Sequence, residues 1–250
     1  MKIRILKYIK KSIIKVNNIY KKIFSYPKKS YDKKTINSYW QVRKKNFNFI
    51  SPNNFQMKRA KFFNQFIDKK NGLLFDIGSG DGAQLIAIKN ICNEIEIIGS
   101  EKDKFALEIM KKNKLKCHFI EKNKSIFKLL NEYDPRYVSI FEVLEHMNSP
   151  EEFILELLKN KNIKIIFASI PNSGFLIHRL RYLFGRFPLQ WIANPNEHLR
   201  FWTLKDLKWW LGYLNIKENS KIIPYQGMPV LNKLMPNLFA EGAFIIIKNV

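Results

Sequence analysis

The stretch Leu73-Leu74-Phe75-Asp76-Ile77-Gly78-Ser79-Gly80-Asp81-Gly82 decides the fold of this chain. It predicts a short apolar strand at 73–75, a glycine loop at 76–82, and a helix over about 83–92. Glycine at every second position lets the backbone turn sharply and approach a ligand closely. The helix that follows presents free N–H groups to that ligand. Because ligands of open parallel sheets bind at such a loop, the stretch indicates a binding site.

The spacing and charges of the loop indicate which kind of ligand binds. A dinucleotide fingerprint would read G-x-G-x-x-G, whereas this loop reads G-x-G-x-G with Asp76 before it and Asp81 inside it. Two carboxylates would repel a pyrophosphate, but they suit a ligand with an ammonium and a sulfonium group. Glu101 ends the next predicted strand, where a carboxylate can accept two hydrogen bonds from ribose hydroxyls.

Apolar strands and helical patterns alternate through the rest of the chain. We expect further strands at 95–99, 117–120, 137–141, 163–170, 222–224 and 243–248. We expect further helices at 55–70, 104–112, 150–159 and 203–214. This alternation predicts an α/β domain over 55–250, in which a mostly parallel sheet carries helices on both faces.

The first 54 residues form a basic extension. Residues 1–50 carry 15 Lys/Arg against the single acid Asp32, in a chain of net charge +23. Residues 3–24 place apolar side chains at a 3-4-3-4-3 spacing among lysines, which predicts a basic amphipathic helix. Such a helix either contacts an anionic membrane surface or packs on its own domain or a partner. We expect no specific nucleic-acid binding, because motifs that read or stack on bases are absent.

The chain carries no predicted membrane span. No apolar run approaches the ~18 residues that cross a bilayer, and lysines interrupt the N-terminal apolar residues, unlike those of a secretory signal. We therefore expect a cytoplasmic protein. If the basic helix contacts a membrane, the protein lies on the inner face of that membrane.

A second motif, Phe141-Glu142-Val143-Leu144-Glu145-His146-Met147, follows the fourth predicted strand. In a helical turn, Glu142, Glu145 and His146 would share one face and could hold a divalent cation. Three ligands are not a complete shell, so we assign no metal and expect Glu142 to line the cofactor pocket. His146 and His198 are the candidates for a general base.

The glycine loop, Glu101 and the strand order together resemble class I S-adenosylmethionine-dependent methyltransferases over about residues 39–250. The resemblance implies a Rossmann-like fold with a seven-stranded, mostly parallel sheet and S-adenosylmethionine as cofactor. It also implies a set of cofactor-binding residues, namely Asp76, Gly78, Ser79, Gly80, Asp81, Gly82, Glu101 and Glu142. The Glu142–Met147 stretch is similar to the E-x-L-E-H signature of ubiquinone-type methyltransferases, some of which are metal-dependent.

A third set of motifs resembles the methionine-biosynthesis protein MetW and its methyltransferase-like relatives. It comprises Ser169–Gly174, Gly185–Pro188, Trp191, Asn194–Thr203 and Pro236–Glu241. This chain departs from MetW in two features. MetW proteins carry an S-Q-T-L-Q type stretch in place of E-x-L-E-H, and they have no counterpart of residues 1–50. Tyr39-Trp40 with Arg43 is instead similar to the opening of methyltransferases found among cell-surface polysaccharide genes. We therefore expect a MetW-like fold with a catalytic type of site.

This family resemblance implies a substrate lid over residues 171–203. The arginines of this segment would suit a phosphate or carboxylate on the substrate, or they are ordinary surface residues. They are Arg179, Arg181, Arg186 and Arg200.

The resemblance predicts a methyltransferase that acts in line on a small hydroxylated or acidic acceptor, such as a sugar or a cell-surface polysaccharide precursor. Two alternatives stay open. MetW-like proteins can serve as a non-catalytic partner of a homoserine O-acyltransferase in methionine biosynthesis. The chain could also be a membrane-peripheral methyltransferase of a quinone or lipid, anchored by residues 3–24.

Overall fold

A computed structural model describes residues 17–24, 51–67, 72–121, 123–188 and 198–250. Its single seven-stranded sheet has the order β3-β2-β1-β4-β5-β7-β6. The strands are β1 (Leu73–Ile77), β2 (Glu96–Glu101), β3 (Cys117–Phe119), β4 (Tyr137–Phe141), β5 (Ile165–Pro171), β6 (Ser220–Tyr225) and β7 (Gly242–Lys248). Strands β1 to β5 pair in parallel, whereas β7 runs antiparallel to β5 and β6. The prediction of a mostly parallel sheet is confirmed.

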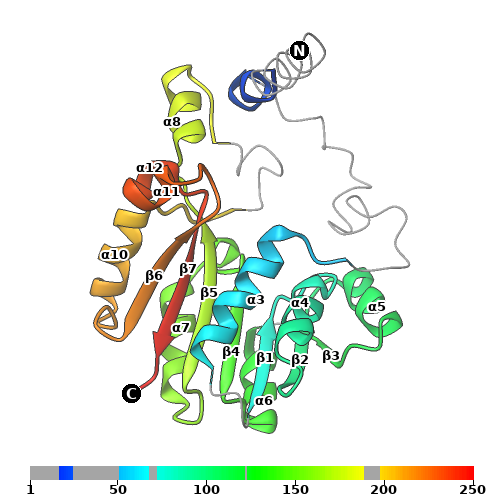
Figure 1. The fold of residues 1–250 in the computed structure, drawn as a ribbon. Coiled ribbons are helices and arrows are strands. Elements are labelled where there is room, and N and C mark those ends of the chain that lie inside the picture. The colour runs from blue at the N-terminus through cyan, green and yellow to red at the C-terminus, as the bar shows by residue number, and fades with distance from the viewer. Residues whose placement is uncertain (1–16, 25–50, 68–71, 122, 189–197) are drawn as a thin grey trace.

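Helices cover both faces of this sheet (Figure 1). They are α3 (Asn54–Phe66), α4 (Ala83–Ile91), α5 (Lys104–Lys112), α6 (Asn123–Tyr133), α7 (Pro150–Lys159), α8 (Leu176–Leu183), α10 (Leu204–Tyr213), α11 (Leu231–Leu234) and α12 (Pro236–Phe239). Strand β5 divides its side chains between two cores. Phe167 packs in the core under α3 and α4, while Ile166 and Ala168 pack in the core under α6, α7 and α10. This is the alternation that a strand buried on both faces requires.

Local capping fixes where several helices begin. Asn53 and Gln56 form a capping box at the start of α3. Thr203 and Asp206 form another at α10, as their spacing in the sequence predicts. Helices α6, α8, α11 and α12 are not among the predicted helices, and α6 and α8 follow β3 and β5.

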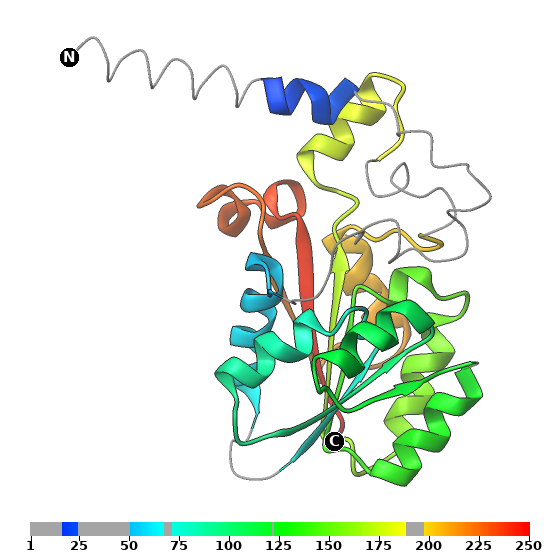
Figure 2. The same cartoon turned by 90° about the vertical axis from the view of Figure 1, so that its right-hand side faces the viewer.

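The predicted extension over residues 1–54 is described at residues 17–24, which are helical, and at residues 51–54, where α3 begins. Residues 3–16 of the predicted helix lie outside the described residues, as do Tyr39-Trp40 and Arg43. Ile23 is buried against Phe175 and Ile177, so this helix lies beside α8 at the end of the molecule where β5 ends (Figure 2). No helix among the described residues is long and apolar enough to cross a membrane.

Candidate functional site

The glycine loop is fastened to the end of β2. The N–H groups of Gly78 and Ser79 both donate to the carbonyl of Ser100 at 2.9 Å. Gly78 and Gly82 have φ of +74° and +84°, a left-handed backbone that favours glycine. A Cβ on Gly78 would lie 2.6 Å from Cγ2 of Val143. The glycine motif therefore meets a backbone and packing requirement of the loop.

Glu101 connects β2 to this loop through its buried carboxylate. Its Oε2 accepts from the N–H of Gly80 at 2.7 Å, and its Oε1 accepts from Lys102 at 2.8 Å and Asp103 at 3.0 Å. A carboxylate offers about four acceptor positions, so these three bonds leave capacity for a ribose hydroxyl. The position of Glu101 fits its predicted role in binding the ribose. Its hydrogen bonds also hold the glycine loop in shape.

Asp76 is the buried charge at the base of the loop. Burial raises the pKa of its carboxyl from 3.8 to about 6, although hydrogen bonds from Ser139 and Ser79 act in the opposite direction. The nearby carboxylate of Glu101 raises this pKa further. Asp81 is also buried, and its Oδ1 accepts from the N–H of Ala83 at 3.1 Å. Three carboxylates around one loop favour a cationic ligand.

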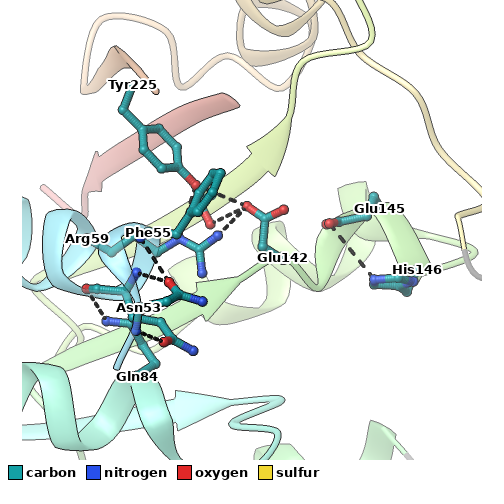
Figure 3. Close-up of polar contacts among 10 residues, drawn as sticks. Asn53, Phe55, Arg59, Gln84, Glu142, Glu145, His146 and Tyr225 are labelled. Atoms are coloured by element: carbon teal, nitrogen blue, oxygen red, sulfur yellow. Dashed lines mark hydrogen bonds and ion pairs between the residues drawn. The ribbon is translucent and has the colours of Figure 1, made fainter. Parts of the chain in front are cut away.

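Glu142 lies at the end of β4 with a φ of +56°, which is unusual for a residue other than glycine. Its Oε1 lies 2.8 Å from Nη2 of Arg59 and accepts hydrogen bonds from the hydroxyls of Ser169 at 2.8 Å and Tyr225 at 3.3 Å. The Nε of Arg59 donates to the same Tyr225 hydroxyl at 3.1 Å. Figure 3 shows Glu142 directed toward Arg59 and Tyr225. This polar cluster joins α3, β4, β5 and β6.

A cavity of about 320 Å³ lies beside this cluster. Burial, followed by the charges of Arg181 and Lys22, lowers the pKa of His178 to about 4, so its imidazole is neutral near pH 7. The Nδ1 of His178 is buried and has no hydrogen-bond partner among the described residues. The cavity therefore carries polar groups on apolar walls. Its lining includes Lys22, Phe55, Glu142, His178, Tyr225 and Glu241.

Glu145, His146 and His198 form a separate group whose ligand atoms lie within 4.8 Å of one another. Nε2 of His146 is 3.9 Å from Oε1 of Glu145, and the rings of His146 and His198 meet edge to face at 4.7 Å. The prediction that Glu142 shares a face with Glu145 and His146 is wrong. The 3₁₀ turn covers only Leu144–His146, and the left-handed backbone at Glu142 directs its side chain to α3 instead. The two predicted bases do contact each other, but they are not among the described residues that line the cavity.

The four arginines of the predicted lid have structural contacts. Arg179 Nε donates to the carbonyl of Gly174 at 2.7 Å, and a guanidinium of Arg200 donates to the carbonyl of Asn148. Arg181 and Arg186 donate to carbonyls of the N-terminal helix. The predicted anion site therefore has no support from these contacts. Trp191 and Asn194–Glu197 lie outside the described residues.

Comparison with known proteins places this geometry in a family. Residues 44–216 match the family model of a methyltransferase domain. No curated protein matches the sequence. A SAM-dependent methyltransferase from Archaeoglobus fulgidus is similar in structure, with a TM-score of 0.54 and 18% identity over 78% of this chain and 93% of that chain.

Two further solved structures share the fold. The plantazolicin methyltransferase BpumL in complex with SAH has a TM-score of 0.55 and 18% identity over 99% of this chain and 100% of that chain. The methyltransferase domain of bacterial CtHen1-C has a TM-score of 0.52 and 16% identity over 78% of this chain and 98% of that chain. The fold is thus the Rossmann-like fold of class I methyltransferases, and the chain belongs to the methyltransferase domain family.

Proposed function

We propose that the chain is an S-adenosylmethionine-dependent methyltransferase that methylates a hydroxyl group of a small acceptor. The glycine loop with Asp76, Asp81 and Glu101 supports the cofactor, because buried carboxylates suit its ammonium and sulfonium groups. A structural neighbour over the full chain is described as a complex with SAH, which agrees with this assignment. The eight residues predicted to bind the cofactor keep that role in the proposal, with Glu142 at the side where the acceptor binds.

The proposal for the acceptor rests on the residues that line the cavity. Glu142, Glu241 and the neutral His178 line the cavity and offer hydrogen-bond acceptors. Such groups suit a ligand that donates through hydroxyls, and the rings of Phe55 and Tyr225 offer apolar surface for a sugar or similar ring. Lys22 also lines the cavity and Arg59 pairs with Glu142, so charge does not decide between the acceptor classes. The hydroxylated class is favoured because of these hydrogen-bond acceptors and the ring surface.

The transfer needs positioning more than activation. Bound S-adenosylmethionine would supply an activated methyl group, which the acceptor oxygen would take in line as the carbon–sulfur bond breaks, giving S-adenosylhomocysteine without the sulfonium charge. The hydroxyl proton passes to a base. His146 and His198 stay proposed for this role, and because they are not among the described residues that line the cavity, the proton would reach them through a water molecule. Glu142, held by Arg59 and Ser169, would orient the hydroxyl through a hydrogen bond.

An acceptor screen tests this proposal. The full chain is incubated with methyl-labelled S-adenosylmethionine and matched hydroxylated, amine and carboxylate acceptors, and release of S-adenosylhomocysteine is measured. We expect turnover only with hydroxylated acceptors. Glu142→Gln should raise KM for the acceptor, and His198→Ala should lower kcat while cofactor affinity stays near normal. Glu156→Gln, on the exposed face of α7, is the matched control.

Two outcomes would contradict it. Methylation of amines or carboxylates without any hydroxyl product would overturn the acceptor class. Cofactor binding with no turnover on any acceptor, together with co-purification of an O-acyltransferase, would support the non-catalytic partner role.

The group of Glu145, His146 and His198 favours a second candidate, a metal-assisted transfer. One carboxylate and two imidazoles fit a divalent transition-metal ion, which would polarise the acceptor oxygen. Metal analysis of the purified protein and thermal unfolding with and without a chelator test this version. No bound metal, together with no effect of the chelator, would remove it.

A further inference from the structure

The helix at 17–24 and α8 form a two-helix layer at one end of the molecule (Figure 2). Ile23 is buried against Phe175 and Ile177. The guanidinium of Arg181, which is 1% exposed, donates to the carbonyls of Lys22 at 2.7 Å and Ile23 at 2.8 Å. Hydrogen bonds from a buried charge are strong and directional. The N-terminal helix is therefore fastened to the domain at its carboxyl end.

The outward side of this layer is apolar and aromatic. The rings of Tyr20 and Phe24 lie 4.8 Å apart, and Phe24 lies 5.0 Å from Phe184. Leu183 beside them is 75% exposed. Tyr20, Phe24 and Phe184 are 61%, 37% and 52% exposed, and a cluster of exposed apolar side chains marks an interaction site. We call these three rings, together with the exposed Ile19 and Leu183 next to them in the sequence, the aromatic face.

The charges around the aromatic face have one sign. Residues 17–24 and 175–188 contain no Asp or Glu, but they contain Lys21, Lys22, Arg179, Arg181 and Arg186. Lys21, Lys22 and Arg179 are exposed. A second copy of this face would bring like charges together, which disfavours dimerisation through it. A partner that presents anionic groups over an apolar interior matches both the positive charges and the aromatic face.

We infer that the aromatic face docks on the surface of an anionic lipid bilayer. Aromatic rings and Leu183 enter the headgroup region, while the exposed Lys21, Lys22 and Arg179 contact lipid phosphates. Lys22, Phe175 and His178 belong to the same two helices and also line the cavity. Docking therefore places the cavity close to the bilayer. This inference does not depend on the methyl-transfer chemistry.

Vesicle sedimentation tests the docking. The full chain is mixed with vesicles of phosphatidylcholine containing phosphatidylglycerol, or of phosphatidylcholine alone. We expect binding to the anionic vesicles that weakens with added salt. The double variant Leu183→Ser/Phe184→Ser should bind at least about tenfold more weakly. The control Trp209→Ser/Tyr213→Ser removes two exposed apolar side chains from α10, at 69% and 66% against 75% and 52% for Leu183 and Phe184, and should bind like the unaltered protein.

Three results would overturn the inference. The first is equal binding by the Leu183→Ser/Phe184→Ser variant, which would assign any attachment to other residues. The second is no binding of the unaltered protein to either vesicle. The third is a dimer in sedimentation velocity that only this variant dissociates, which would identify a second copy as the occupant. Cooperative thermal unfolding of each variant at an unchanged temperature shows that the domain is folded, whether or not the cofactor binds, so these failures are separate from failure of the proposed function.

Discussion

Replacing Glu101 with Gln hardly changes the volume of the side chain. It does change the carboxylate that accepts three hydrogen bonds at the glycine loop. The carboxylate accepts three backbone N–H groups, from Gly80 on Oε2 and from Lys102 and Asp103 on Oε1. A carboxamide has one oxygen and one NH₂ group. In either orientation, Glu101→Gln therefore turns a donor toward at least one of these N–H groups.

The magnitude follows from the loss of one hydrogen bond to a buried charged acceptor. Such bonds contribute about 1.5–3 kcal/mol, and each 1.4 kcal/mol corresponds to about tenfold in affinity. The N–H of Gly80 belongs to the loop that meets the cofactor. In the variant, part of the binding free energy must hold this loop in place, so we expect cofactor affinity to fall by up to about 100-fold, with a lower melting temperature for the unliganded protein.

Calorimetry with S-adenosylmethionine, with thermal unfolding alongside, measures both effects. Asp103→Asn is the matched control. It makes the same carboxylate-to-carboxamide change two residues away, where the side chain caps α5 and Asn caps a helix about as well as Asp. Equal affinities for Glu101→Gln and the unaltered protein would refute the reasoning that Glu101 organises the loop.

Three further predictions concern other parts of the molecule. Burial raises the pKa of Asp76 from 3.8 to about 6, so unliganded stability should fall as pH rises from about 4 to 6 and then stay level. Affinity for the cationic cofactor should fall below about pH 6, and Asp76→Asn should abolish this pH dependence in calorimetric titrations. Arg181→Met should release the N-terminal helix, because it removes two hydrogen bonds to the carbonyls at 22 and 23. Trypsin should then cleave that helix faster, and unchanged cleavage would contradict the contact. Gly78→Ala puts a Cβ 2.6 Å from Val143 in a left-handed backbone and should lower the unfolding free energy by at least about 1–2 kcal/mol in denaturant titrations. Gly212→Ala, on a helix where the nearest contact is 3.9 Å away, should be neutral or stabilising.

The fold was largely predictable because its signals are local. The strands around the glycine loop are short apolar runs, and the capping pair of Thr203 and Asp206 marks the start of α10 within four residues. Helix α6 is harder to predict because it begins in the polar run Asn123-Lys124-Ser125, even though Ile126 and Leu130 have a helical spacing. Helix α8 lies within the segment for which the family resemblance implies a lid, and that resemblance does not indicate a helix there.

The site was predictable only where its residues are neighbours in the chain. The loop residues and Glu101 came from one motif and one strand end. Arg59 and Tyr225 are 166 positions apart, and their contact with Glu142 depends on how α3 packs against β6. Positive φ at Glu142 is likewise a tertiary outcome, and it separates this carboxylate from Glu145. No periodicity in the sequence carries that information.

Calorimetric titration of the intact chain with S-adenosylmethionine and S-adenosylhomocysteine tests the central claim most directly. We expect each ligand to bind at one site, and we expect Asp76→Ala, which removes the buried carboxylate at the base of the loop, to abolish or severely weaken the binding of S-adenosylmethionine. Absence of any binding heat in the intact protein, confirmed by an unchanged melting temperature, would contradict the assignment of the glycine loop as the cofactor site.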